Sequence, residues 1–167
     1  MNATIIIDTR EQRPLSIAAY PTVCDTLPVG DYGIAGFSDW DNPAFIVERK
    51  SLGDLVASLT HGRERFMREV EKLRQFRFAA ILVEAWQSHI ENAEYATFTT
   101  PQSILASIAA IQVRAGVHVI WCGTPKGAAD MLDRLVRQFV RGIQKDADRL
   151  GAKIVEKPAR RRAAANE

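Results

Sequence analysis

The chain has 167 residues, which is enough for one domain with a sizeable core but not comfortably enough for two. Hydrophobic residues make up 47% of it, and 22 basic against 20 acidic residues give a formal net charge of +2. This balance alone does not identify a nucleic-acid binder, because the distribution of charge matters more than its sum. No run approaches the roughly 18 apolar residues that span a bilayer, and no signal peptide is recognisable at Met1–Thr4. We therefore expect a soluble, cytoplasmic protein that has no membrane partner.

The cysteines offer no sign of a metal centre or a disulfide framework. Cys24 and Cys122 lie far apart in the sequence, without the spacing of metal ligands. We expect both to be reduced thiols in the core of an intracellular protein.

Short apolar runs predict strands in the first half of the chain. A β-branched run at Thr4–Ile7 ends on Asp8, and a second apolar run at Ala44–Val47 ends on Glu48. Weaker candidates cover residues 22–27 and 32–35, with the turn Pro28–Asp31 between them.

Helices and strands alternate in the second half. We predict helices over residues 51–59 and 63–76, a fully buried strand over 78–84, a helix over 100–115, a strand over 117–122 and a long helix from 124 to about 150. The pattern predicts an α/β fold with a central mixed β-sheet flanked by helices. Residues 1–150 would form this domain, and residues 151–167 a basic, disordered tail.

Acidic residues at the ends of strands are the first indication of chemistry. Glu48 and Lys50 are two apart in an extended strand, so their side chains point to the same face while Arg49 points to the other. Asp31 and Glu48 suit the oxygen-ligand role for a Mg²⁺ ion, and the backbone carbonyl of Arg49 could add a third oxygen. Lys50 suits a water molecule or a phosphate oxygen at such a metal.

A surface ion pair between Glu48 and Lys50 is the competing interpretation, since E-x-K is a common pattern. The apolar run before the pair anchors it on a core strand. In addition, Asp8, Glu11, Asp31 and Glu48 would gather at one edge of the sheet, which is costly unless a cation neutralises them.

At this point the motifs resemble those of a known family. Gly30-Asp31-Tyr32, followed by Glu48-Arg49-Lys50 and Asp54, is similar to the GD…ERKxxxD signature of the XPF family of structure-specific endonucleases. Asp8-Thr9-Arg10-Glu11 resembles that family's upstream D-x-R-E element, and the similarity extends over about residues 5–135.

The resemblance implies a restriction-endonuclease-like nuclease fold of the PD-(D/E)xK type, dependence on Mg²⁺ or Mn²⁺, and cutting of branched or flapped DNA in repair or recombination. By matching position, Asp31 and Glu48 would be metal ligands and Lys50 the catalytic lysine. Asp8 and Glu11 would be further active-site acids, with Asp8 also a metal ligand. Arg49 and Asp54 would support the site, although Asp54 could equally cap a helix.

Three further expectations concern partners. Arg10, Arg63 and Arg65 are candidate DNA contacts. The helix at 101–115 has apolar residues on several faces, so we expect a homodimer built from it and the long helix after Pro125. Family members usually continue into tandem helix-hairpin-helix domains, which do not follow here, so fine junction specificity is left open. The alternative to an active nuclease is a non-catalytic module that binds or scaffolds DNA junctions.

Overall fold

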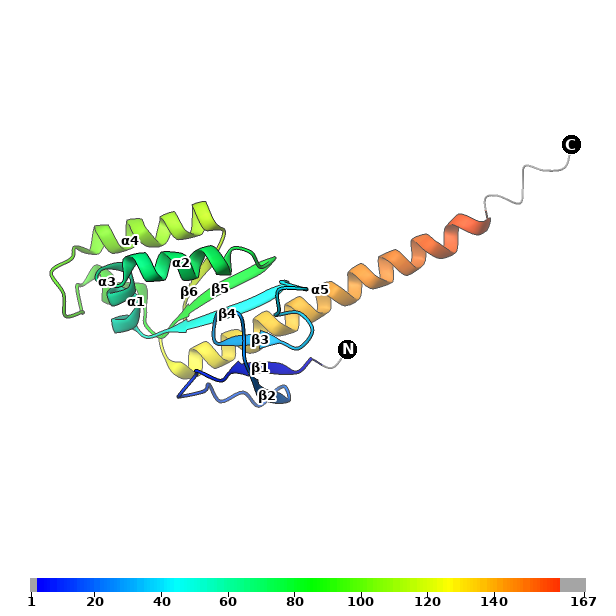
Figure 1. Cartoon of the computed structure of the whole chain (residues 1–167), viewed down its shortest axis with the longest axis horizontal. Coiled ribbons are helices and arrows are strands. Elements are labelled where there is room, and N and C mark those ends of the chain that lie inside the picture. Colours follow the sequence, from blue (N-terminus) through cyan, green and yellow to red (C-terminus); the bar gives the residue numbers. More distant parts are fainter. Residues whose placement is uncertain (1–2, 160–167) are drawn as a thin grey trace, which may run out of the picture.

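The computed structural model describes residues 3–159 and contains one six-stranded sheet with helices on both faces (Figure 1). The strands are β1 (Ile5–Asp8), β2 (Thr22–Asp25), β3 (Tyr32–Ile34), β4 (Phe45–Lys50), β5 (Phe78–Val83) and β6 (His118–Trp121). The helices are α1 (Leu52–Leu59), α2 (Arg63–Leu73), α3 (Gln87–Glu91), α4 (Pro101–Ala110), the π-helical turn η1 (Ile111–Ala115) and α5 (Pro125–Ala159).

The sheet is mixed, as the sequence predicts. Its strand order is β2-β1-β3-β4-β5-β6. Strand β3 is antiparallel to both of its neighbours, β1 and β4, whereas the β1–β2, β4–β5 and β5–β6 pairs are parallel. The predicted α/β class with a flanked mixed sheet is confirmed.

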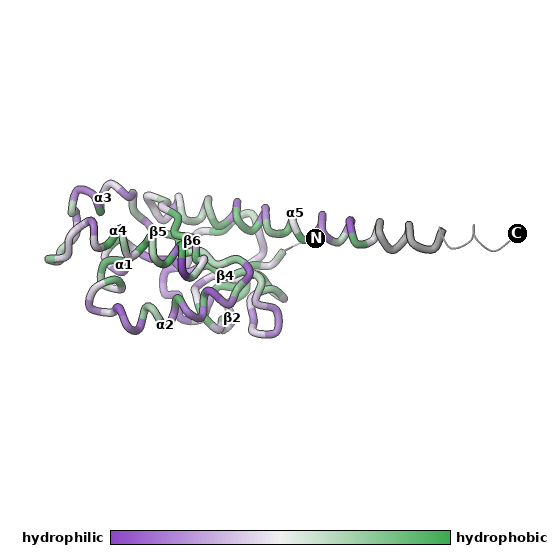
Figure 2. The backbone as a smooth tube through the Cα atoms, turned by 90° about the horizontal axis from the view of Figure 1, so that it is seen from above, coloured by the Kyte–Doolittle hydropathy of each residue, from purple (hydrophilic) through white to green (hydrophobic). Residues whose placement is uncertain are grey.

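Each face of the sheet has its own apolar cluster. Figure 2 shows α5 on one side of the sheet and α2 on the other. On one face, Ile46, Ile81 and Val83 pack under α1, α2, α4 and η1. On the other face, Val47 and Leu82 pack under α5, together with Leu132 and Val136 of that helix. Strands β4 and β5 are therefore covered on both sides, which explains their continuous apolar sequences.

The antiparallel position of β3 decides where the acidic residues meet. The turn before β3 lies beside the ends of β1 and β4, because the N–H of Asp8 donates to the carbonyl of Asp31 (2.9 Å) and the N–H of Asp31 donates to the carbonyl of Val47 (2.9 Å). Gly30 makes this turn possible. Its φ is +76°, and a Cβ atom there would lie 2.9 Å from the Val47 carbonyl oxygen.

The structure differs from the predicted elements in three places. Helix α3 was not predicted, because its five residues are too short to show a helical period. Helix α5 continues to Ala159, so the predicted tail at 151–167 begins inside a helix; residues 160–167 lie outside the described part of the chain. Cys122 is buried as expected, but the core position predicted for Cys24 is wrong, since Cys24 is exposed on the edge strand β2.

The predicted homodimer rests partly on a helix that its own domain covers. Ile104 and Ile108 of α4 and Ile111 of η1 are each no more than 5% exposed, because they pack in the cluster above β5. These residues are core and do not form the exposed surface expected of helix 101–115. None of the described helices is long and apolar enough to cross a membrane.

Candidate active site

Asp31 and Glu48 form the acidic pair at the centre of the site. Asp31 lies in the turn before β3, and the backbone N–H of Arg49 donates to its Oδ2 atom (2.8 Å). Burial, followed by repulsion from Glu48, raises the pKa of Asp31 to about 7. Burial also raises the pKa of Glu48, although Lys50 opposes that rise. Burial thus disfavours the charged form of both carboxylates, and Glu48 adds to this effect at Asp31.

Lys50 neutralises one side of this pair. Its Nζ atom donates to Oε1 of Glu48 (2.8 Å), and the lysine is only 8% exposed. The same ammonium group lies 4.9 Å from the ring centre of Phe66, a buried residue of α2. The carboxylate and the aromatic ring together hold Lys50 in one place beside Glu48, as the E-x-K spacing predicts.

Arg49 belongs to a different network on the opposite side of β4. Its Nε atom donates to Oε1 of Glu84 (2.6 Å), its Nη2 to Oε2 of Glu84 (3.2 Å), and its Nη1 to Oε2 of Glu11 (3.2 Å). These carboxylates raise the pKa of Arg49 above its usual value, against the effect of burial. Tyr32, buried beside this network, donates from its hydroxyl to the same Glu11 oxygen (3.4 Å). Arg49 and Glu11 thus support the site without facing Lys50.

Glu84 is the functional candidate that sequence reasoning left without a role. It follows β5, and its N–H donates to the carbonyl of Lys50 (2.9 Å). The signal was present in the sequence, since Glu84 closes an apolar strand on a carboxylate in the same way as Asp8 and Glu48.

The carboxylate of Asp8, for which a metal-ligand role was predicted, is hydrogen-bonded within the protein. Its Oδ1 atom accepts from the N–H and Nε of Arg10 (2.9 and 2.6 Å), and its Oδ2 accepts from Nη2 of Arg10 and the N–H of Leu27 (3.0 and 2.7 Å). Burial opposes ionisation of Asp8, but the bonds from Arg10 and Leu27 hold its pKa below the usual value. Asp8 is therefore an anchor for Arg10 and for the segment at Leu27.

Asp54 belongs to the capping arrangement of helix α1, in which Ser51 is the N-cap. The Ser51 hydroxyl accepts from the N–H of Asp54 (3.1 Å) and donates to its Oδ2 atom (2.6 Å). This reciprocal arrangement satisfies a donor at the start of the helix. Of the two roles left open for Asp54, the structure displays the structural one, as the bonding partner of the N-cap Ser51.

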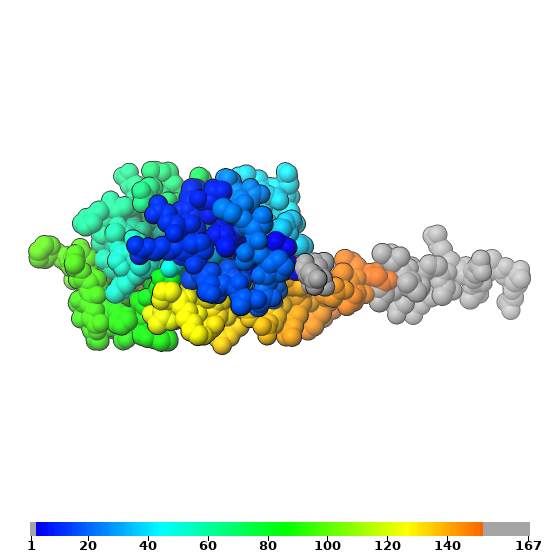
Figure 3. Space-filling view, turned by 90° about the horizontal axis from the view of Figure 1, so that it is seen from below, coloured from blue at the N-terminus to red at the C-terminus, as the bar shows by residue number. Residues whose placement is uncertain are grey.

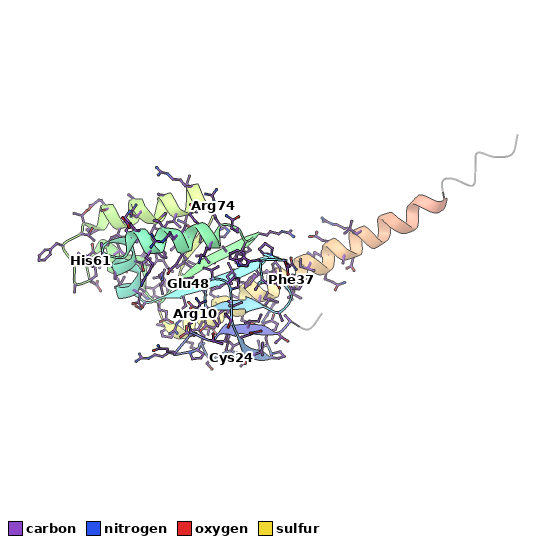
Figure 4. The ribbon with its side chains drawn as sticks, viewed as in Figure 1. Arg10, Cys24, Phe37, Glu48, His61 and Arg74 are labelled. Atoms are coloured by element: carbon purple, nitrogen blue, oxygen red, sulfur yellow. The ribbon has the colours of Figure 1, made fainter. Side chains whose placement is uncertain are left out.

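Two adjoining clefts surround the acidic pair. The first has a volume of about 500 Å³ and contains Asp31, Glu48 and Arg10 among its lining residues; in Figure 4, Arg10 and Glu48 lie together near the centre of the domain. The second, of about 560 Å³, is lined by Lys50, His61 and Arg65. Asp54 lines both.

The three predicted DNA contacts separate into two groups. Arg10 and Arg65 line these clefts, and their side chains are 64% and 78% exposed. Arg63 donates instead to the Ser107 hydroxyl of α4 (3.1 Å) and lines a groove with Arg74 on the far side of α2. Arg63 is not brought to the site.

The donor atoms at Asp31 and Glu48 fit a divalent cation. Both side chains offer hard oxygens, and their mutual repulsion would be relieved by a positive ion between them. The N–H of Arg49 points toward Asp31, and in a strand the N–H and C=O of one residue face the same neighbouring strand. The Arg49 carbonyl therefore lies on the Asp31 side, as the predicted third ligand requires.

Comparisons with known proteins identify the family and the fold of the chain. The model of the ERCC4 domain family matches residues 7–135. Two structures of XPF from Aeropyrum pernix are similar: one, a complex with DNA, at 24% identity and a TM-score of 0.63, the other at 25% and 0.64. They cover 84% and 81% of this chain, which in turn spans 66% and 60% of theirs, less than two thirds in each case. No curated protein matches the chain significantly.

The family match includes both Asp31 and the Glu48-Arg49-Lys50 segment, and the sheet that carries them is that of the XPF nuclease fold. This chain therefore belongs to the ERCC4 domain family and has the restriction-endonuclease-like fold of its XPF members.

Proposed function

We propose that this protein is a DNA endonuclease that hydrolyses phosphodiester bonds with the help of Mg²⁺ or Mn²⁺. The observation that carries the proposal is the crowded pair Asp31 and Glu48, held at one edge of the sheet with Lys50 bonded to Glu48. A buried acidic pair costs stability unless it serves a cation or a proton.

Each residue of the site has a distinct part in such a reaction. Asp31, Glu48 and the Arg49 carbonyl would hold the ion, which when bound activates water and neutralises charge on the phosphate. Lys50, with its ammonium fixed by Glu48 and Phe66, is placed to orient water or to stabilise the phosphate oxygens as negative charge develops. Arg10 and Arg65 would bind neighbouring phosphates from the two clefts.

We further propose branched or flapped DNA as the substrate. One similar structure is described as XPF from Aeropyrum pernix in complex with DNA, which supports DNA as the ligand class for this fold. The clefts on both sides of Asp54 leave the acidic pair open to a strand that passes across it.

The other candidate function is a non-catalytic module that binds DNA junctions. The two clefts beside the acidic pair would bind DNA equally well in such a module. A module that only binds DNA, however, has no need of Lys50 beside two carboxylates. Retention of that arrangement favours the enzyme.

The two functions are separated by a cleavage assay on a panel of flapped, forked and fully paired DNAs. We expect nicking that requires Mg²⁺ or Mn²⁺ and disappears in EDTA. Asp31→Asn and Glu48→Gln should abolish it while the far-ultraviolet circular dichroism is unchanged. Lys50→Ala should lower the rate at saturating DNA by at least ~100-fold with little change in affinity. Full activity in EDTA would overturn the metal-dependent enzyme, and binding without cleavage under every metal condition would favour the junction-binding module.

We also propose that the chain forms a homodimer through α5. The outer part of this helix extends beyond the sheet, where a second copy of the chain could pack against it (Figure 1).

A further inference from the structure

Trp86 is a large aromatic side chain left at the surface beside the candidate active site. It is 55% exposed and lies between β5 and α3. A single exposed aromatic residue needs no explanation by itself. What distinguishes Trp86 is how it is held and what lies next to it.

The indole ring of Trp86 packs against the backbone of Gly123, the second residue after β6. A Cβ atom on Gly123 would lie 2.3 Å from Cζ2 and 2.4 Å from Cε2 of the ring, so only glycine allows the ring to rest there. The backbone is fixed as well, because the N–H of Trp86 donates to Nδ1 of His89 (3.2 Å) and the N–H of His89 donates to the Trp86 carbonyl (3.1 Å). The ring is thus held in place at the surface before any ligand binds.

Backbone hydrogen bonds connect the segment that carries this ring to the catalytic edge of the sheet. Glu84, two residues before Trp86, bonds to the Lys50 carbonyl and lines the cleft that contains Asp31 and Glu48. The N–H of Gly123 donates to the carbonyl of Ala85 (3.0 Å), which draws the end of β6 to the same edge. Trp86 therefore stands where the carboxyl ends of β4, β5 and β6 meet.

A further cleft adjoins the catalytic cleft and contains three cationic side chains. It has a volume of about 530 Å³, shares Arg13 and Arg49 with the catalytic cleft, and reaches Lys126 at the start of α5, three residues after Gly123. Asp130 also lines this cleft and accepts a hydrogen bond from Lys126 (2.8 Å). Figure 3 shows the N-terminal segment (blue) and the start of α5 (yellow) side by side on this surface. Proteins that bind single strands combine a basic groove along the backbone with aromatic side chains for the bases.

We infer that a single-stranded arm of the DNA leaves the catalytic cleft over Arg13 and Lys126, with one unpaired base stacked on Trp86. This inference rests on the proposed nuclease function and adds a specificity-determining residue to it. A base in a continuous duplex is stacked on its own neighbours and cannot reach the ring. Trp86 therefore selects DNA that has unpaired nucleotides next to the site of cleavage.

Trp40 provides a matched control. It is 53% exposed and packs against Phe76, which precedes β5, so it lies at the opposite edge of the sheet. Replacing either tryptophan removes a similar exposed ring, but only Trp86 lies at the end of the sheet where Asp31 and Glu48 meet.

The test measures binding by the full chain carrying Glu48→Gln, so that DNA is held but not cut. The probes are a duplex with a single-stranded arm, carrying 2-aminopurine at the first unpaired positions, and a fully paired duplex of the same length. Trp86→Ala should abolish the stacking-dependent quenching and weaken binding of the armed duplex by about 5- to 100-fold. Trp86→Phe should restore most of both, Trp40→Ala should resemble the parent, and binding of the paired duplex should not change.

Two results would overturn the inference alone: armed-duplex binding by Trp86→Ala that equals that of Trp40→Ala, or an equal loss on paired and armed duplexes. A parent chain that binds neither probe, together with a wild type that cuts no DNA with Mg²⁺ or Mn²⁺, overturns the proposed function and removes the basis of the inference.

Discussion

Asp31 carries an electrostatic cost in the metal-free domain. Its pKa is about 7 in the folded protein, against 3.8 for an ordinary aspartate. Since the folded-state pKa is raised, folding is penalised when the residue ionises: the penalty begins above pH 4, grows to about pH 7 and is complete above it. A rise from 3.8 to about 7 corresponds to at most ~4 kcal/mol.

Asp31→Asn should therefore stabilise the metal-free protein, and the gain should depend on pH. Thermal unfolding in EDTA should show the variant several degrees more stable than wild type at pH 8, with the difference shrinking toward pH 4. Asp25→Asn is the matched control, because Asp25 also ends a strand but is exposed. A pH-independent difference between Asp31→Asn and wild type would mean that Asp31 is not under this repulsion.

Glu84 is predicted to position Arg49 rather than to take part in the chemistry. Glu84 accepts two hydrogen bonds from the Arg49 guanidinium. The backbone N–H of Arg49 donates to Asp31, and its carbonyl is the proposed third ligand of the ion. Glu84→Ala should weaken Mn²⁺ binding, measured by electron paramagnetic resonance of free Mn²⁺, by about tenfold, as loss of an outer-shell partner does. Glu84→Gln, which keeps one acceptor for Arg49, should recover part of the affinity. Unchanged Mn²⁺ affinity in Glu84→Ala would exclude this positioning role.

At the scale of elements, the sequence predicted most strands and helices because each has a strong local signal. The apolar runs that end in Asp8 and Glu48 are β1 and β4, and Thr100-Pro101 marks the start of α4. The prediction that Cys24 is buried was wrong because the burial of an edge strand depends on which element covers it. All four residues of β2 are exposed, and nothing in the local sequence indicates this.

The site was predictable to the same extent. The E-x-K spacing correctly placed Glu48 beside Lys50, since strand periodicity is local. The metal-ligand role of Asp8 was predicted from the resemblance of Asp8-Thr9-Arg10-Glu11 to a family element. The bonds of Asp8 to Arg10 and Leu27 come from loop conformations that no periodicity records. Glu84 joins Arg49 only through the parallel pairing of β4 with β5, a long-range fact that the sequence does not show.

Two substitutions at the start of α1 test whether Asp54 stabilises the helix or takes part in the reaction. Ser51→Ala should lower the free energy of unfolding by about 1 kcal/mol, because it removes the cap. Asp54→Asn retains an acceptor for the Ser51 hydroxyl, so it should keep cleavage within about threefold of wild type if the duty is structural. If Asp54→Asn instead loses as much cleavage activity as Asp31→Asn, while urea titration shows an unchanged free energy of unfolding, Asp54 takes part in the chemistry.

On the scale of the whole molecule, α5 is too long for the domain it covers. Its 35 residues extend over roughly 50 Å, whereas the six residues of β4 or β5 extend over about 20 Å. The inner part packs on the sheet through Leu132 and Val136, but residues 141–150 are exposed apart from the half-buried Ile143. A helix that projects into solvent gains little stability from its own propensity.

The apolar stripe of α5 nevertheless continues past the sheet. Val136, Ile143 and Leu150 repeat every seven residues, which is the spacing of a coiled-coil seam, and Leu150 is 62% exposed. A second copy of the chain that presents the same stripe would cover it, in an isologous contact between the two α5 helices. This surface replaces the face of α4 first expected, since Ile104 and Ile108 are buried in their own domain.

We predict a homodimer that dissociates when a charge is placed on this stripe. Leu150→Glu should yield a folded monomer, because Leu150 contributes nothing to the core of its own domain. Gln144→Glu, which adds the same charge at a polar exposed position of the same helix, should remain dimeric. Sedimentation equilibrium across a concentration series measures the outcome. A wild type that stays monomeric at high micromolar concentration excludes the dimer. If Leu150→Glu leaves the dimer intact and Gln144→Glu disrupts it, the contact lies on another face of α5.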